Sequence, residues 1–205
     1  MIAIIDYGLG NLFSIQNMLK HIEIDSRITN DKNEIERSSH LIIPGVGKFD
    51  EGMRNLQNKQ LDIVIKDEAA NGKPVLGICL GMQLLGVSSE EGEKAGLGLI
   101  DFKTIRFQLE EGEHRKIPHM GWERVKLKDC PLTIGLDDRQ RYYFVHSYHA
   151  VCDDDNTAII TCNYGYEFVA AVRNQNIYGV QFHPEKSHRY GMRILKNFAE
   201  IESDV

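Results

Sequence analysis

Cys79 is the residue whose setting is best suited to nucleophilic chemistry. It stands between two glycines in the segment 77–81, which reads GICLG. The apolar run before it predicts a strand and the residues after it predict a helix, so the segment has the pattern of a nucleophile elbow. A Cβ at either glycine would collide with a neighbouring element, and the turn places the sulfur near free N–H groups that favour thiolate. The alternative is a buried cysteine between two packing glycines.

His183 could serve this cysteine as a proton carrier. It follows a predicted strand, and Glu185 lies two residues further on, so in an extended segment the carboxylate could fix the imidazole tautomer. Taken alone, a His-Pro-Glu sequence also fits a solvated strand end. Together with the cysteine, these residues predict a Cys-His-Glu triad for acyl transfer. His146 and His149 are reserve candidates, but neither has a carboxylate two positions on.

An acyl-transfer site also needs hydrogen-bond donors for the oxyanion of its intermediate. The backbone N–H of Leu80 is one predicted donor, and the glycine-rich turn of Gly45, Val46 and Gly47 is expected to supply a second. A plain tight turn is the alternative for that segment. Gln83 lies on the same helical face as the nucleophile, where it could hold a polar substrate or could simply be an exposed helix former.

The first half of the chain alternates apolar runs with helical patterns. Strands are predicted at residues 2–6, 41–43 and 75–76, and each ends at a glycine-rich turn. Helical spacing follows the first strand at residues 12–22, and further helices are predicted within 50–71. Strands that alternate with helices favour a parallel sheet covered on both faces, with ligands at the carboxyl ends of the strands.

The second half is richer in short strands with β-branched and aromatic residues. These are predicted at residues 102–108, 123–127, 141–151, 157–163, 168–173 and 177–182. Residues 174–176 predict a hairpin turn, and residues 188–201 predict a closing amphipathic helix.

Composition excludes several classes of protein. The chain has 205 residues, of which 42% are hydrophobic and 26% charged, as is typical of a globular domain. A formal net charge of -6 gives no electrostatic footprint for nucleic acid or an anionic membrane. No apolar run approaches the ~18 residues of a membrane span, and the N-terminus lacks a signal-peptide pattern, so we expect a cytoplasmic protein. The four cysteines form no zinc-like motif, and we expect neither a metal site nor a cofactor.

On these residues the chain resembles the class I (triad) glutamine amidotransferases, and more narrowly the glutaminase subunits of imidazole glycerol phosphate synthases. The matching segments cover essentially the whole length, at residues 6–11, 44–47, 77–85, 118–122, 143–148 and 179–187. The cysteine elbow and the His-Pro-Glu sequence belong to the wider class, whereas PGVG, PHMGW and HPEKS are narrower. No matched catalytic position departs from the pattern.

The resemblance implies one domain over residues 1–205 with a three-layer, flavodoxin-like α/β fold, whose central, mainly parallel sheet carries an antiparallel β extension. It implies hydrolysis of L-glutamine to glutamate and ammonia. The implied residues are Cys79 as nucleophile, His183 as proton carrier, Glu185 to orient it, and Gln83, Ser147 and Tyr148 to bind glutamine.

The family's ammonia passes to a separate (β/α)8-barrel synthase subunit, which forms imidazole glycerol phosphate in histidine biosynthesis. The resemblance therefore implies a heterodimer, and the positions that match the partner contact are Asn11, Pro118, Met120, Trp122 and Lys186. Tryptophan is enriched at interface hot spots, although core packing is the alternative for Trp122.

Two other functions stay open. A paralogue that supplies ammonia for amidation of a bacterial surface-polysaccharide sugar would share every residue named above. A non-catalytic regulatory module on the same fold should have lost a triad residue, and this chain has all three.

Overall fold

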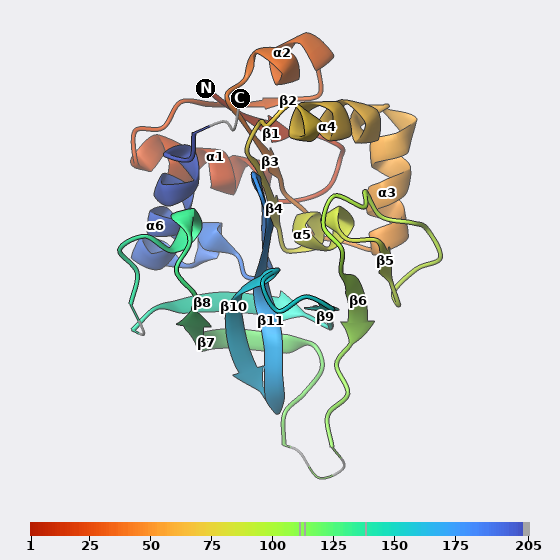
Figure 1. Cartoon of the computed structure of the whole chain (residues 1–205), viewed down its shortest axis with the longest axis vertical. Helices are drawn as coiled ribbons and strands as arrows, with labels where there is room; N and C mark the ends of the chain where they lie inside the picture. Colours follow the sequence, from red (N-terminus) through yellow and green to blue (C-terminus); the bar gives the residue numbers. More distant parts are fainter. Residues whose placement is uncertain (111, 113, 138, 203–205) are drawn as a thin grey trace.

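One mixed sheet forms the centre of the molecule (Figure 1). The computed structural model describes residues 1–110, 112, 114–137 and 139–202, and within them the sheet has 12 strands. Its parallel part has the spatial order β2 (Ser26–Thr29), β1 (Ile2–Ile5), β3 (His40–Ile43), β4 (Val75–Ile78) and β12 (Ile177–Val180). Every residue of β1, β3, β4 and β12 is buried, as expected of parallel strands covered on both faces.

Beyond β12 the sheet becomes antiparallel. A tight hairpin through Gln175, whose φ is 52°, connects β11 back to β12 and confirms the predicted turn. The sheet continues through β11 (Tyr166–Asn174), β10 (Ala158–Tyr164), β7 (His119–Leu127) and β8 (Arg141–His146). A branch leaves β11 through β9 (Tyr148–Val151), β6 (Lys103–Arg106) and β5 (Ser88–Ser89).

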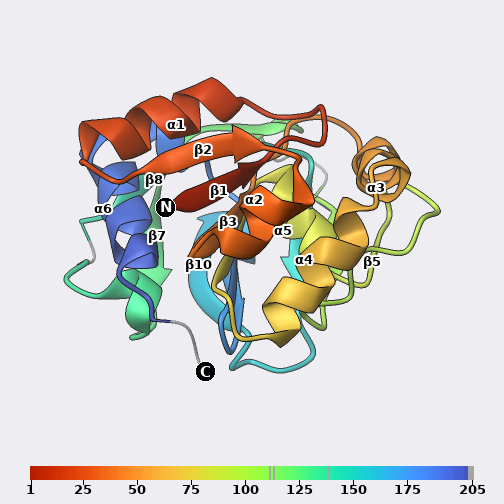
Figure 2. The same ribbon diagram turned by 90° about the horizontal axis from the view of Figure 1, so that it is seen from above.

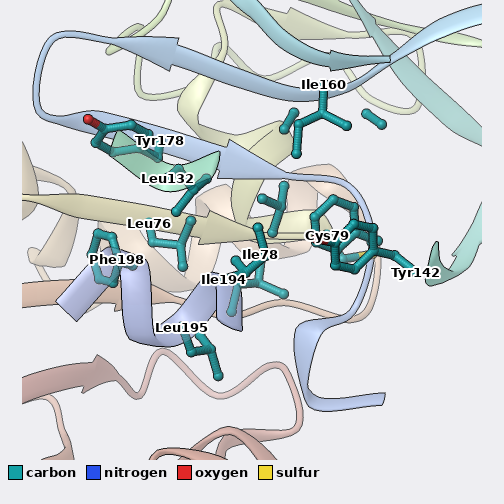
Figure 3. Packing of buried hydrophobic residues seen from close by; sticks show 14 of the residues in the cluster. Leu76, Ile78, Cys79, Leu132, Tyr142, Ile160, Tyr178, Ile194, Leu195 and Phe198 are labelled. Atoms are coloured by element: carbon teal, nitrogen blue, oxygen red, sulfur yellow. The ribbon is translucent and has the colours of Figure 1, made fainter. Parts of the chain in front are cut away.

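Helices cover both faces of the parallel strands (Figure 2). On one face lie α1 (Leu12–His21) and α6 (His188–Ala199). On the other lie α2 (Lys32–Arg37), α3 (Phe49–Asn58), α4 (Leu61–Ala70) and α5 (Leu80–Leu85). Alternation along β1 divides the core, because Ile2 and Ile4 join the cluster under α1 and α6 whereas Ala3 and Ile5 join the cluster under the other helices. Figure 3 shows the first cluster, with side chains of β4 beside those of α6.

The expected three-layer α/β fold with an antiparallel extension is confirmed, and the differences are local. β2 and α2 were not predicted, because β2 is an edge strand with only Thr29 buried and α2 has six residues with only Ile35 buried. The strand expected over 141–151 breaks at Ser147, where the chain leaves its pairing with β7 and begins to pair with β6 and β11. Among the described residues, no helix is long and apolar enough to cross a membrane.

Candidate active site

Cys79 occupies a strained turn between β4 and α5. Its φ of 54° and ψ of -108° place a non-glycine residue in a conformation that L-residues rarely adopt. A Cβ on Gly81 would lie 1.8 Å from the carbonyl oxygen of Ile43 in β3, and one on Gly77 would lie 2.6 Å from the backbone nitrogen of Met82 in α5. Both glycines are therefore required by close backbone approach, and the turn has the geometry of a nucleophile elbow.

The pairing of β12 with β4 brings His183 to this turn. The two strands run parallel with Val180 in register with Ile78, so the residues that follow both strands meet at one edge of the sheet. His183 Nδ1 lies 2.8 Å from Glu185 Oε1, and both side chains are almost fully buried. The local structure differs from the extended segment expected here. Residues 184–186 form a 3-10 turn, so the contact is made by the turn and not by strand alternation.

Electrostatics at the site favour a protonated His183. Burial by itself would lower its pKa, but the hydrogen-bonding and negative charge of Cys79 and Glu185 outweigh burial and raise the pKa from 6.5 to about 10. His183 Nε2, the atom on the other side of the ring from Glu185, is buried without a fully aligned hydrogen-bond partner among the described residues. The arrangement is that of an imidazolium beside a sulfur, with a carboxylate fixing the ring from behind.

Two glutamine side chains connect the sulfur to the opposite wall. Gln83 Nε2 donates to Gln181 Oε1 at 3.0 Å and to the backbone carbonyl of Tyr148 at 3.4 Å. Gln181 Nε2 in turn donates to Cys79 Sγ at 3.7 Å. Gln83 is 5% exposed, so the alternative of an exposed helix former is wrong. Both amide hydrogens of Gln83 are used inside the protein, which leaves its Oε1 as the acceptor for a ligand.

Cys79 and His183 line a cavity of about 250 Å³. Of the other residues singled out from the sequence, the cavity is lined by Val46, Gly47, Leu80, Gln83, Ser147, Tyr148, Pro118 and Lys186. A larger cavity of about 450 Å³ lies beside the start of α6, but its described lining contains neither cysteine nor histidine. The smaller cavity is thus the one that joins the nucleophile to the predicted oxyanion and substrate residues.

Of the residues predicted for the triad, the oxyanion donors, the substrate and the partner contact, five lie outside the lining: Gly45, Glu185, Asn11, Met120 and Trp122. Gly45 packs tightly, since a Cβ there would lie 2.6 Å from Tyr7 Oη and 2.7 Å from Leu80 Cβ. Its role is to let β3 approach α5, and Val46 and Gly47 are the loop residues that reach the cavity. Glu185 lies behind His183, as an orienting residue must.

The cavity also contains a carboxylate that the sequence analysis missed. Glu91 lines the cavity, and its Oε2 accepts a hydrogen bond from the backbone N–H of Phe49 at 2.9 Å. It follows the short strand β5, in an acidic stretch without a motif, so no local signal in the sequence marks it. Val145 and His146 complete the lining.

The reserve histidines are structural in this fold. His146 Nδ1 donates to the Tyr148 carbonyl at 2.7 Å, and burial lowers its pKa to about 3, so it supports the cavity wall as a neutral imidazole. His149 lies outside the cavity lining, where Nδ1 contacts the Ala150 carbonyl and Nε2 contacts Tyr166 Oη. Neither is placed to replace His183.

An exposed apolar surface adjoins the cavity on β7. Met120 is 60% exposed and Trp122 is 38% exposed, so the core-packing alternative for Trp122 is wrong. The indole stacks on the ring of His188 with centroids 5.5 Å apart. Pro118, two residues before Met120, lines the cavity, and so does Lys186, whose Nζ lies 5.7 Å from the ring centroid of Tyr143. Pro118 therefore joins the cavity lining to the exposed surface of β7.

The chain is similar to proteins of one known family over nearly its whole length. The family model for class-I glutamine amidotransferases matches residues 3–201. The imidazole glycerol phosphate synthase subunit HisH 2 of Methanococcus maripaludis is 52% identical, over 97% of this chain and 98% of its own. Subunit HisH of Sulfurimonas denitrificans is 50% identical, over 99% of both chains, and subunit HisH 2 of Pseudomonas aeruginosa is 46% identical, over 98% and 100%.

Solved structures agree in fold. A crystal structure titled as a glutamine amidotransferase superposes with a TM-score of 0.76 at 17% identity, over 97% of both chains. PurLQS from Thermotoga maritima gives a TM-score of 0.73 at 19% identity, over 97% of this chain and 96% of the other.

Proposed function

The chain belongs to the class-I glutamine amidotransferases, and we propose that it is a glutaminase that hydrolyses L-glutamine to glutamate and ammonia. The observation that carries the proposal is that three groups come together beyond the carboxyl ends of the parallel strands β4 and β12. Cys79 stands on a strained elbow, His183 lies beside it with a raised pKa, and Glu185 holds the imidazole from behind. A nucleophile, a proton carrier and an orienting carboxylate are the groups that covalent amide hydrolysis requires.

Acylation uses the sulfur and the imidazolium. The Cys79 thiolate attacks the side-chain carbonyl carbon of glutamine, and the oxygen of the tetrahedral intermediate takes the negative charge. The N–H of Leu80 and an N–H of the loop at Val46 and Gly47 stabilise that oxyanion. His183 then gives its proton to the departing nitrogen, the C–N bond breaks, and ammonia leaves a thioester on the sulfur.

Deacylation uses the now neutral imidazole. His183 takes a proton from water as the water oxygen attacks the thioester carbonyl. The C–S bond breaks, glutamate is released, and the sulfur is again a thiolate beside an imidazolium. Glu185 keeps the Nδ1 hydrogen bond throughout, so the same ring nitrogen faces the substrate in both half-reactions.

The cavity has the size and polarity for one amino acid. Its volume of about 250 Å³ lies just below the ~300 Å³ at which pockets for drug-sized ligands begin. Gln83 Oε1 and the Glu91 carboxylate are acceptors suited to the α-ammonium group of glutamine, and the backbone at Ser147 and Tyr148 lines the same cavity. A carboxylate on an ammonium gives charge-assisted recognition that an uncharged amide would lack.

The product ammonia is proposed to pass to a partner. The relatives named above are synthase subunits. The exposed Met120 and Trp122, on the strand that follows the cavity-lining Pro118, form a surface on which a (β/α)8-barrel subunit would dock to make a heterodimer. Asn11 is exposed just before α1. In that assembly the ammonia would be used to form imidazole glycerol phosphate in histidine biosynthesis.

Glutamate release tests the catalytic assignment. The chain is purified with its barrel partner, and glutamate formation is measured for the wild type, Cys79→Ala and the matched control Cys130→Ala. We expect Cys79→Ala to be inactive and the control to keep wild-type rates, because Cys130 lies on another part of the chain, before a 3-10 turn. Equal rates in wild type and Cys79→Ala would remove the sulfur from the mechanism.

The partner distinguishes the histidine pathway from amidation of a surface sugar. Both uses of ammonia need the same triad, so co-purification from the native host and rescue of a histidine auxotroph that lacks its own glutaminase are the informative measurements. Recovery of growth with the matching barrel supports the histidine pathway. Failure of rescue despite correct expression, with a sugar-amidating synthetase in the purified complex, would replace it with the alternative.

A further inference from the structure

Gln181 is a buried polar side chain that contacts the nucleophile but takes no part in the steps above. It has 0% exposure, and its Nε2 donates to Cys79 Sγ at 3.7 Å. We propose that Gln181 is a positioning residue, which orients the Cys79 sulfur and stabilises its thiolate form. The inference deepens the proposed glutaminase function, because it concerns the same sulfur.

The position of Gln181 in the chain places it on the sulfur. Gln181 directly follows β12, where its backbone N–H donates to the Ala170 carbonyl of β11 at 2.8 Å, and His183 lies two residues further on. Phe182 between them stacks on Tyr142 with ring centroids 3.9 Å apart, in the core cluster under α1 and α6. One strand end therefore supplies both groups that contact the nucleophile.

The orientation of the Gln181 amide is fixed by its neighbours. The Tyr148 carbonyl accepts hydrogen bonds from His146 Nδ1 and from Gln83 Nε2, so the amide of Gln83 must present its NH2 group there. The same NH2 group donates to Gln181 Oε1. If the Gln181 amide were flipped, two NH2 groups would face each other and a carbonyl oxygen would face the sulfur. The network thus aims an N–H donor, and not an acceptor, at Cys79.

A fixed donor matters here because little water reaches the sulfur. Cys79 is only 8% exposed, so a thiolate there depends on protein dipoles for the stabilisation that water would otherwise give. His183 contributes charge from one direction and Gln181 contributes an oriented N–H from another. Two contacts from different directions also restrict rotation about the Cα–Cβ bond, which sets the direction of attack.

The pH profile of Cys79 alkylation tests this assignment. The full chain is treated with iodoacetamide from pH 5 to pH 10, and the rate at Cys79 is read by mass spectrometry of its peptide. Gln181→Met removes the donor, and Gln181→Glu keeps the acceptor for Gln83 while it replaces the donor by a carboxylate. Gln108→Met, at an exposed glutamine, is the matched control.

We expect the midpoint of the profile to move up by about one pH unit in Gln181→Met and further in Gln181→Glu, which lowers the rate roughly tenfold or more at pH values below the wild-type midpoint. The limiting rate at high pH should stay at the wild-type value, as should the whole profile of Gln108→Met. A merely structural role would change the limiting rate without moving the midpoint.

Wild-type midpoints in both variants would overturn the inference. If Gln181→Met does not fold, Gln181→Glu carries the test, because it retains the hydrogen bond to Gln83. The alkylation assay uses no glutamine, so its outcome is independent of glutaminase activity. Absence of glutamate release by the wild type would count against the proposed function alone.

Discussion

Acidification should destabilise this protein through its buried histidines. His119 is fully buried between aromatic rings, with Tyr164 stacked at 3.9 Å, and burial lowers its pKa to about 4. Burial likewise lowers the pKa of its neighbour His146 to about 3. In the unfolded chain both would titrate near 6.5. Between pH 6.5 and about pH 4, these histidines bind protons in the unfolded state but not in the native state, so the free energy of unfolding falls as pH falls.

The magnitude follows from the unfolded value alone, since both native pKa values lie below the window. Lowering the pH from 6.5 to 5.0 costs about 1.6 kcal/mol for each histidine and about 3 kcal/mol for the pair. Burial also lowers the pKa of His40 and of His149, which adds loss in the same direction. His183, whose pKa is raised, is protonated in the native state throughout this window while the unfolded state takes up its remaining half proton, so it offsets only about 0.4 kcal/mol of the loss. A loss of this size is a large part of the ~5 to 15 kcal/mol typical of a folded domain.

Urea unfolding followed by far-ultraviolet circular dichroism at pH 6.5 and pH 5.0 measures the effect. The His119→Phe variant keeps an aromatic ring in the stack. It removes Nε2, which has no hydrogen-bond partner among the described residues, and Nδ1, which lies 3.0 Å from His146 Nε2. It should lose about 1.6 kcal/mol less than the wild type between the two pH values. His21→Gln, at an exposed position of α1, is the control and should match the wild type. The reasoning is refuted if the wild type loses less than about 1 kcal/mol, or if His119→Phe loses as much as the wild type.

Two further predictions concern the site and its scaffold. His183→Asn should slow glutamate release roughly 10²- to 10⁴-fold, because the histidine transfers protons. The complex with the barrel partner should still form, because His183 is buried. Loss of the complex in this variant would contradict the assigned role of His183. Gly81→Ala places a methyl group 1.8 Å from the Ile43 carbonyl oxygen and should cost about 3 kcal/mol or more in unfolding free energy, or prevent folding. Gly98→Ala is the control, since a Cβ there meets nothing within 4 Å. It should cost only about 1 kcal/mol of unfolding free energy, through the positive φ of Gly98. Equal losses of unfolding free energy in the two variants would contradict the steric argument.

Elements with local signals were predictable from the residues alone. The apolar runs of β1, β3 and β4 and the glycines around Cys79 predict strands, turns and a nucleophile elbow, because backbone sterics act over a few residues. The His-Pro-Glu sequence likewise marked His183 and Glu185. The reason given for their contact was wrong, since a 3-10 turn and not an extended strand brings them together.

Which of these residues come into contact depends on the pairing of distant strands. His183 reaches Cys79 only because β12, about a hundred residues later in the chain, inserts beside β4 in the register that pairs Val180 with Ile78. Hydrogen bonding between the two strands sets that register, and the residues that flank each strand do not indicate which strand it will pair with. Glu91 in the cavity, Gln181 on the sulfur and Trp122 at the surface share this origin. Their roles come from packing between distant segments, which spacing along one chain does not encode.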